Sequence, residues 1–452
     1  MRHLVVIGGV AAGTSAAAKA RRVDAGLKIS LFTQEGRVSY GSCGLPYFIA
    51  GQIAEERQLI ARTVEVFAQQ GIEVHLYQRA EEIDPTRRLV RVVDVREGAQ
   101  REVGYDALVI ATGASPVLPP VPGRELAGVF TLRTLDDGLA IRRYLQEQSP
   151  QRAVIVGAGY IGLEMVEAFH QRGMSVTVVE MAPQVLPNMD ADMAALVQEY
   201  LEGREVRVLT AERVLALEPA AGQAADRVGL VRTERHELPA ELVLLSAGVR
   251  PNAALAARAG VALGAAGAIR VNQRMETNLP NVYAAGDCAT TVHLVSGEEV
   301  YLPMGTTANK QGRVAGANAA GGEASFPGVV GTGIARNLEM EVARTGLCER
   351  ECKALGIDYR TRTIRSRTVP GYFPGSGRIH VKVLAEHPGG RLLGAQIVGR
   401  AGSAKRIDVF ATALTLGAAV GRLWDADLAY APPFSPVFDP VLLALNAFRR
   451  EA

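Results

Sequence analysis

The chain has 452 residues, and its 49 lysines and arginines nearly balance 47 aspartates and glutamates, which leaves a net charge of +2. At roughly 150 residues per domain, this length provides for about three domains with apolar cores and excludes a small binding module. The balance of charge argues against a nucleic-acid-binding surface. No apolar run is long enough to span a bilayer, and the N-terminus lacks the form of a signal peptide. We therefore expect a cytoplasmic protein that does not bind a membrane.

Residues 3–22 form the first of two predicted strand–turn–helix units. The strand at residues 3–7 runs into Gly8, Gly9 and Gly13, with Val10 where the middle glycine of a G-x-G-x-x-G motif would stand. Such glycines permit a tight turn, and the N-terminus of the following helix stabilises phosphate. The next strand, residues 28–32, is followed by Thr33 and Gln34 before the first acid, Glu35. The unit predicts a dinucleotide site with an unusual ribose position.

Cys43 stands just before a short apolar helix, which we predict to begin near Pro46 and to end at Gly51. A thiol at a helix N-terminus has a stabilised thiolate, so we expect its pKa to fall below about 8.5. The alternative is an inert core cysteine, which is the commoner fate of a cysteine among apolar residues. The Ser42–Gly44 context and the neighbouring nucleotide fold favour a nucleophile.

The second strand–turn–helix unit covers residues 153–173 and contains a complete G-x-G-x-x-G at Gly157, Gly159 and Gly162. Glu180 ends the next strand, close to the roughly 20-residue spacing of a ribose-binding acid. This carboxylate would accept hydrogen bonds from a 2′-hydroxyl and repel a 2′-phosphate. We therefore expect NADH in preference to NADPH, which stays the alternative.

The rest of the chain predicts three more buried strands and a separate C-terminal domain. Buried strands are predicted within residues 105–113, 241–252 and 281–289, and Asp287 after the last of these could bond a ribityl hydroxyl of FAD or form an ordinary Asx turn. From about residue 326 the alternating pattern indicates an antiparallel sheet with flanking helices. Cys288, Cys348 and Cys352 have no histidine at zinc-ligand spacing, so no metal site is expected.

Several segments together resemble the pyridine nucleotide-disulfide oxidoreductases, namely VSYGSCGLPYFIAG, YDALVIATGASP, the motif ending at Glu180, AGVRPN, NVYAAGDCA and NKQGRVAG. The resemblance is to the single-cysteine branch of coenzyme A-disulfide reductases, NADH oxidases and NADH peroxidases. Phe48 stands where glutathione reductase-like members have a second cysteine. Val10, Ala11 and Ala12 replace the first-loop histidine of the oxidases and peroxidases. The coenzyme A-disulfide reductase pattern fits best, including DLAYAPPFSPVFDP at residues 427–440.

The resemblance implies an α/β fold with two Rossmann-like dinucleotide-binding domains (glutathione reductase-like) and a C-terminal α+β dimerisation domain. We expect residues 1–118 and 251–325 to form the FAD-binding domain, residues 119–250 the NADH-binding domain, and residues 326–452 the dimerisation domain. FAD, NADH and coenzyme A are the implied cofactors and ligands. The cofactor-binding residues would be Gly8, Gly9, Gly13, Thr33, Glu35, Ala111, Thr112, Gly113, Gly157, Gly159, Gly162, Glu180, Gly248, Gly286 and Asp287.

The resemblance also implies roles around Cys43. Tyr430 would reach the cysteine of the partner subunit in a homodimer with shared sites, and Tyr372 is also implicated in catalysis. Lys19, Arg22, Ser39 and Ser42 would bind coenzyme A, with Arg21 near its phosphates. Ser42 replaces a common Asn, and Thr33 replaces a ribose-binding Glu.

The expected reaction passes electrons from NADH through FAD to a mixed disulfide or persulfide of Cys43. Coenzyme A disulfide, coenzyme A persulfide, and polysulfide or sulfur all stay open as acceptors. The alternatives are an NADH oxidase or peroxidase that uses a cysteine sulfenic acid, an electron-transfer reductase for a small iron protein, and a redox sensor.

Overall fold

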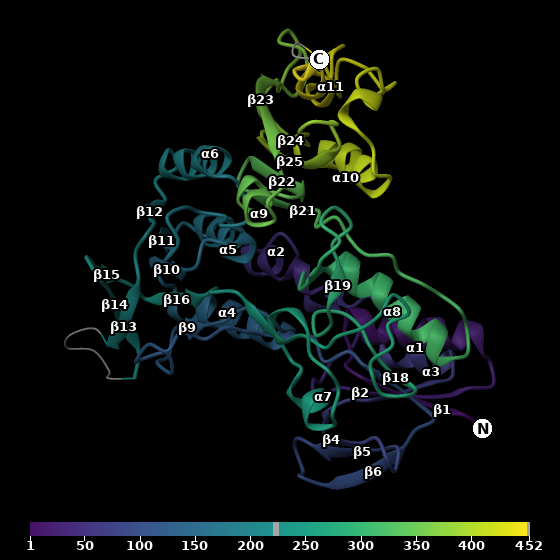
Figure 1. Ribbon diagram of the computed structural model, residues 1–452. Helices are drawn as coiled ribbons and strands as arrows, with labels where there is room; N and C mark the ends of the chain where they lie inside the picture. Colours follow the sequence, from purple (N-terminus) through teal and green to yellow (C-terminus); the bar gives the residue numbers. More distant parts are fainter. Residues whose placement is uncertain (220–225, 450–452) are drawn as a thin grey trace.

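The chain folds around three five-stranded sheets, two of them parallel and the third antiparallel (Figure 1). The computed structural model describes residues 1–219 and 226–449. The predicted fold class, two dinucleotide-binding domains followed by a domain with an antiparallel sheet, is confirmed. The domain boundaries at residues 118, 250 and 325 stay a prediction.

The first domain contains a parallel sheet that is buried on both faces. Its strands, in spatial order, are β18 (Val282–Ala284), β7 (Ala107–Ile110), β1 (His3–Ile7), β2 (Lys28–Phe32) and β3 (Ile72–His75). Leu4 and Val6 face a core shared with α1 (Ala11–Val23) and α8 (Gly305–Ala319). Val5 and Ile7 face the antiparallel strands β4 (Gln78–Asp84), β5 (Leu89–Asp94) and β6 (Gln100–Gly104). Burial on both sides explains the continuous apolar runs in the sequence.

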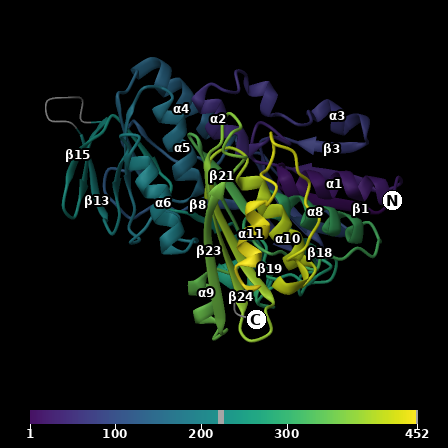
Figure 2. The same ribbon diagram turned by 90° about the horizontal axis from the view of Figure 1, so that it is seen from above.

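The second domain repeats this arrangement. Its parallel strands are β12 (Arg207–Leu209), β11 (Ser175–Val179), β10 (Arg152–Val156), β16 (Leu242–Leu245) and β9 (Val129–Phe130). Helices α4 (Leu135–Gln148), α5 (Tyr160–His170) and α6 (Ala191–Glu202) belong to it, as do β13 (Val214–Pro219), β14 (Val228–Thr233) and β15 (Glu237–Pro239). Strands β8 (Ala114–Pro116) and β17 (Val249–Pro251) pair antiparallel. Seen from above, β13 and β15 lie at the opposite end of the molecule from α1 (Figure 2).

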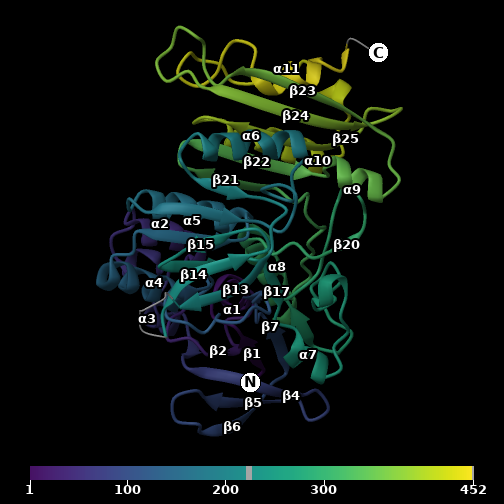
Figure 3. The ribbon, with the colours of Figure 1, turned by 90° about the vertical axis from the view of Figure 1, so that its left-hand side faces the viewer.

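The C-terminal domain has the predicted antiparallel sheet and flanking helices. The strand order is β21 (Gly333–Asn337), β22 (Met340–Gly346), β25 (Leu392–Gly399), β24 (Arg378–Glu386) and β23 (Tyr359–Arg367), with helices α9 (Glu349–Ala354), α10 (Ile407–Thr415) and α11 (Pro440–Asn446). The shorter elements elsewhere are α2 (Leu45–Ala50), α3 (Val64–Gln69), α7 (Ala254–Arg258), β19 (Thr291–Val292) and β20 (Glu299–Val300). Figure 3 shows this sheet above the two other domains, with α6 beside it.

Helices α1 and α8 cross with their backbones in contact. A Cβ added at Gly312 would lie 2.3 Å from the Ala12 carbonyl oxygen, and one added at Gly316 would lie 2.1 Å from that of Ala16. Contacts below 3 Å do not occur for real Cβ atoms, so only glycine fits at either position. The contact therefore places the start of α1 beside the middle of α8.

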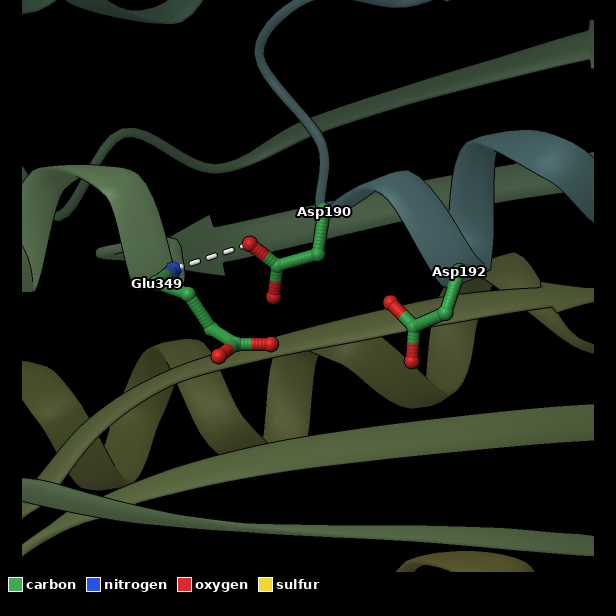
Figure 4. Close-up of side chains that lie close together, drawn as sticks. All are labelled: Asp190, Asp192 and Glu349. Carbon is green, nitrogen blue, oxygen red and sulfur yellow. Dashed lines mark hydrogen bonds between the residues drawn. The ribbon is translucent and has the colours of Figure 1, made fainter.

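The second and C-terminal domains meet in an ionic cluster, of which Asp190 and Lys382 are buried. Asp190, Asp192 and Glu349 direct their carboxylates toward one another (Figure 4). The Lys382 ammonium of β24, 3% exposed, lies 2.7 Å from an Asp192 oxygen, 3.2 Å from one of Asp190, and in contact with Glu349. The ammonium supplies the countercharge that a metal ion would otherwise provide, and we propose no metal site here.

A search of the described helices for a span long and apolar enough to cross a membrane finds none.

Candidate active site

Cys43 is exposed to solvent at the junction of two helices. It lies in the turn of 3-10 helix Ser42–Gly44 that leads into α2, which ends at Gly51 with φ +90°, as predicted. The first residue of α8, Gly305, approaches the sulfur so closely that an added Cβ would lie 3.9 Å from Cys43 Sγ. The thiol therefore stands at the start of a 15-residue helix from another part of the chain.

The expected lowering of the Cys43 pKa is wrong for this environment. Removal of water from the thiol raises its pKa, and the carboxylates of Glu164 and Asp287 raise it further. The Arg133 cation and a hydrogen bond with Ser42 act in the opposite direction but do not prevail. Helix α2 has only six residues, so its dipole is small, whereas the two carboxylates come from distant segments.

Glu164 is a residue that the sequence interpretation missed. Burial raises its pKa to about 7, with a further contribution from the nearby charge of Glu167. A glutamate in the mostly apolar helix α5, two residues after the last glycine of the motif, was the available signal. This carboxyl changes charge near neutral pH and is electrostatically coupled to Cys43.

The first glycine loop has the geometry of a dinucleotide cradle. Gly8 has φ +115°, and a Cβ there would lie 2.0 Å from the Ala111 carbonyl oxygen, while a Cβ at Gly13 would lie 1.9 Å from that of Gly8. Helix α1 has no side-chain N-cap, so its first N–H groups are available to a phosphate. Thr33 is buried, and its side chain would contact a Cβ placed at Gly9. These features fit the FAD that the sequence predicts.

Glu35 does not extend into open solvent. Its carboxylate accepts a 2.6 Å hydrogen bond from the Tyr40 hydroxyl, and burial raises its pKa. Glu35 therefore lies next to the loop that leads to Cys43, where Tyr40 holds its side chain.

Asp287 lies at the turn after β18, where Gly286 has φ +86°. Its carboxylate accepts a 2.8 Å hydrogen bond from Arg133, which the sequence interpretation missed because no motif marks that loop. Gly113, with φ +66°, also lies beside the Arg133 guanidinium. The other predicted cofactor residues lie in the turns after β7 and β16, namely Ala111, Thr112 and Gly248.

The second glycine loop repeats the geometry of the first. Gly157 has φ +109°, and an added Cβ at Gly162 would lie 2.1 Å from the Gly157 carbonyl oxygen. Gly159 is the N-cap of α5, which has no side-chain cap. The Glu180 carboxylate accepts hydrogen bonds from the N–H groups of Ala158 (2.7 Å) and Ala182 (2.8 Å). The acid is thus held at the glycine loop, where a ribose would meet it.

A basic cavity of about 480 Å³ lies along α1 and α8. Lys19 and Arg22, the coenzyme A contacts that the resemblance implies, line it together with Arg62 and Arg313, which the sequence interpretation missed. Ser15 and Asn309 also line it and share a 2.7 Å hydrogen bond. The cavity suits a ligand with several phosphate charges.

Three predicted coenzyme A contacts lie outside the residues that line this cavity. The Arg21 guanidinium donates to the carbonyl oxygens of Gly71 (2.7 Å) and Ala25 (2.5 Å), so the expectation that it holds phosphates is wrong. Ser39 is buried with φ +54°, and its N–H donates to the Gly9 carbonyl at 2.8 Å. Ser42 lies beside Cys43.

Tyr372 and Tyr430 lie on two exposed loops of the C-terminal domain. Their phenols form a hydrogen bond that raises the pKa of Tyr430. Tyr372 is 76% exposed and Tyr430 46%, and three large apolar side chains that follow Tyr430 in the sequence are more exposed than Tyr430 itself: Phe434, Val437 and Phe438. An exposed aromatic surface of this kind is typical of a site of contact with another molecule.

Comparisons with known proteins agree with this architecture. The family model for pyridine nucleotide-disulphide oxidoreductase matches residues 2–323, and that for the dimerisation domain of the same family matches residues 337–441. The NAD(P)H sulfur oxidoreductase (CoA-dependent) of Pyrococcus furiosus is 40% identical over 99% of both chains. The coenzyme A disulfide reductase of Staphylococcus haemolyticus is 30% identical over 96% of both.

Among solved structures, the NAD-dependent persulfide reductase from A. fulgidus superimposes with a TM-score of 0.95 at 40% identity, covering 99% of this chain and 83% of the other. With both family models matched in order and relatives aligned over almost their whole length, the chain belongs to the pyridine nucleotide-disulphide oxidoreductase family.

Proposed function

We propose that this protein is an FAD-dependent NADH oxidoreductase that reduces coenzyme A disulfide or a coenzyme A persulfide through Cys43. The observation that carries the proposal is the alignment of thiol and cations along α8. Gly305 adjoins the Cys43 sulfur, Asn309 donates a 2.9 Å hydrogen bond to the Gly305 carbonyl, and Arg313 follows one turn later in the basic cavity. At about 1.5 Å per helical residue, roughly 12 Å separates Gly305 from Arg313.

This separation suits coenzyme A. Its thiol end and its phosphates are joined by an extended pantetheine arm, which could lie along α8 with sulfur at Cys43 and phosphates among the four cations. The relatives named above act on coenzyme A disulfide or are coenzyme A-dependent, which supports the same reading.

The chemistry follows from the residues around the sulfur. The Cys43 thiolate attacks one sulfur of the substrate disulfide, so a Cys43–sulfur bond forms and the substrate S–S bond breaks. The departing coenzyme A thiolate would take a proton from the partner subunit's Tyr430. When bound, FAD supplies the two-electron carrier between the nicotinamide and Cys43. Two electrons from NADH then break the Cys43–sulfur bond and release the second thiol.

The choice of NADH rests on Glu180. Two backbone N–H groups hold its carboxylate at the second glycine loop, where it would bond a 2′-hydroxyl and repel a 2′-phosphate. Met181 beside it is 68% exposed and offers no cation to a 2′-phosphate.

The proposed assembly is a homodimer with shared sites. The C-terminal domain matches the family's dimerisation domain, and the exposed aromatic surface around Tyr430 is suited to packing against a second copy.

Cys43→Ser tests the central claim. We expect the variant to keep its flavin and its NADH-dependent reduction of ferricyanide, which takes electrons from the flavin directly, but to lose turnover with coenzyme A disulfide. Steady-state assays with the two acceptors measure both. Undiminished disulfide turnover would show that Cys43 is structural.

Glu164→Gln should make Cys43 more reactive in a pH-dependent way. The wild-type carboxyl is charged above pH 7 and then disfavours the thiolate, so removing the charge lowers the Cys43 pKa. Iodoacetamide should alkylate the variant several-fold faster above pH 7, since one pKa unit is tenfold in thiolate. Below about pH 6 the two rates should converge, because Glu164 is then neutral in the wild type.

Glu202→Gln, at the exposed end of α6, is the matched control and should follow the wild-type profile. A Glu164→Gln profile that is equal to the wild-type profile at every pH would refute the coupling.

Arg313→Met tests the coenzyme A cavity. The KM for coenzyme A disulfide should rise by on the order of tenfold, corresponding to one charge-assisted contact of roughly 1.4 kcal/mol, while the KM for NADH is unchanged. The disulfide of pantetheine, which lacks the nucleotide, should be turned over equally by variant and wild type. An equal loss with both disulfides would place the effect outside phosphate binding.

Complementation tests the shared site. Cys43→Ser homodimers should be inactive with coenzyme A disulfide, and Tyr430→Phe homodimers should be slower by on the order of a hundredfold. In a mixed dimer, one site has Cys43 from one chain and Tyr430 from the other. Activity should therefore return on subunit exchange. If mixed dimers form without recovery of activity, each site belongs to a single chain.

A further inference from the structure

Helix α2, which carries Cys43 at its start, belongs to the core of the second domain. Leu45, Phe48 and Ile49 are 2% exposed or less and pack in one cluster with Ile155 of β10 and Leu163 of α5. The sequence of α2 lies within the first domain, but its apolar side is buried elsewhere. The place of the sulfur therefore depends on how the second domain holds this helix.

The end of α2 is fixed to α5 by polar contacts as well. Arg172, just beyond α5, donates a 2.9 Å hydrogen bond to the carbonyl of Ile49, the penultimate residue of α2. Gln52, two residues past the helix, donates to the Glu167 carboxylate of α5 at 3.2 Å.

Glu167 joins these contacts to the C-terminal domain. The residue is 3% exposed, and its two carboxylate oxygens accept hydrogen bonds from Arg336 Nη2 of β21 at 2.7 Å and from the N–H of Leu338 at 2.9 Å. One buried carboxylate thus links α5, the end of α2, and the turn after β21. A buried charge with directional partners fixes geometry closely, because displacement leaves it unpaired at high cost.

The same network reaches back toward the sulfur. The Arg336 guanidinium carbon lies 5.8 Å from the centroid of the Tyr47 ring, and Tyr47 lies in the first turn of α2, four residues after Cys43. Both ends of α2 are therefore held, through Arg336 and Glu167, against β21, an edge strand of the C-terminal sheet.

We infer that Glu167 is a positioning residue: it holds Cys43 at the correct distance from the proton donor on the partner subunit. The inference rests on the proposed function, in which the partner's Tyr430 is delivered through contact between the two C-terminal domains. The separation of Cys43 from that hydroxyl then depends on how each chain's own C-terminal domain is set against α2. Proton transfer requires hydrogen-bond distance, and a misplacement of about 1 Å can cost a hundredfold in rate.

The test compares holoenzyme carrying Glu167→Gln with Glu339→Gln. Glu339 lies in the same turn as Leu338 and pairs with Arg204 of the second domain and Arg400 of the C-terminal domain, but it does not contact α2. For Glu167→Gln we expect kcat with coenzyme A disulfide to fall on the order of tenfold, with unchanged KM for NADH and unchanged NADH-dependent ferricyanide reduction. Glu339→Gln should match the wild type in all three measurements.

A double-mutant cycle separates positioning from loosening of the fold. In a Tyr430→Phe background, Glu167→Gln should have little further effect on kcat, because the donor to be aligned is already absent. Arg336→Met removes the same contact from the side of β21. It should likewise lower kcat with coenzyme A disulfide and leave the KM for NADH and ferricyanide reduction unchanged. This second variant allows the test to be made if Glu167→Gln folds poorly. Additive losses, an equal loss of ferricyanide reduction, or an unchanged kcat would each overturn the inference. Retained disulfide turnover in Cys43→Ser would instead overturn the proposed function.

Discussion

The backbone contact between α1 and α8 is the constraint on which the site depends. Gly312 and Gly316 allow the two helices to touch at Ala12 and Ala16, and the start of α1 then lies beside the middle of α8. The start of α1 belongs to the first glycine loop, and the start of α8 adjoins Cys43. Further along, the same two helices supply Lys19, Arg22 and Arg313 to the basic cavity. One helix crossing therefore fixes the relation between nucleotide loop, thiol and cations.

The charged groups around the Cys43 sulfur determine how readily it forms a thiolate. Cys43 is exposed, but the surrounding protein displaces part of the water near its sulfur. This partial desolvation and the carboxylates of Glu164 and Asp287 raise the Cys43 pKa, while the pKa of Glu164 itself is about 7. Two groups that each disfavour the other's charge titrate as a coupled pair. Formation of the thiolate at Cys43 thus favours the protonated form of Glu164. The reactivity of the thiol therefore responds to the charge of a residue of another domain.

Local patterns predicted the parts of the molecule that depend on local chemistry. The glycine loops, the end of α2 at Gly51 and the antiparallel C-terminal sheet follow from steric needs and periodicity that are visible in a few residues. The Cys43 pKa was predicted wrongly, because the carboxylates that raise it come from residues 164 and 287. Arg21 was misplaced for a similar reason, since helical position alone did not show that its guanidinium turns to the Gly71 carbonyl. Arg62, Arg133 and Arg313 reach their sites only through tertiary packing. No short motif marks Arg62 or Arg133, and the segment NKQGRVAG, which contains Arg313, did not by itself indicate that this side chain lines the basic cavity.

Two of the contacts between the second and C-terminal domains are ionic, one at Lys382 and one at Glu167. Lys382 is buried among three carboxylates, and Glu167 is buried against Arg336 and the Leu338 N–H. Buried ion pairs add little net stability compared with apolar packing, so stability alone does not explain two of them at one boundary. Apolar surfaces tolerate small sliding motions, whereas a carboxylate with directional donors has one favourable arrangement. The active site that we propose, with Cys43 of one chain and Tyr430 of another, would need that single arrangement more than extra stability, because its two halves would meet only if each chain orients its C-terminal domain in the same way.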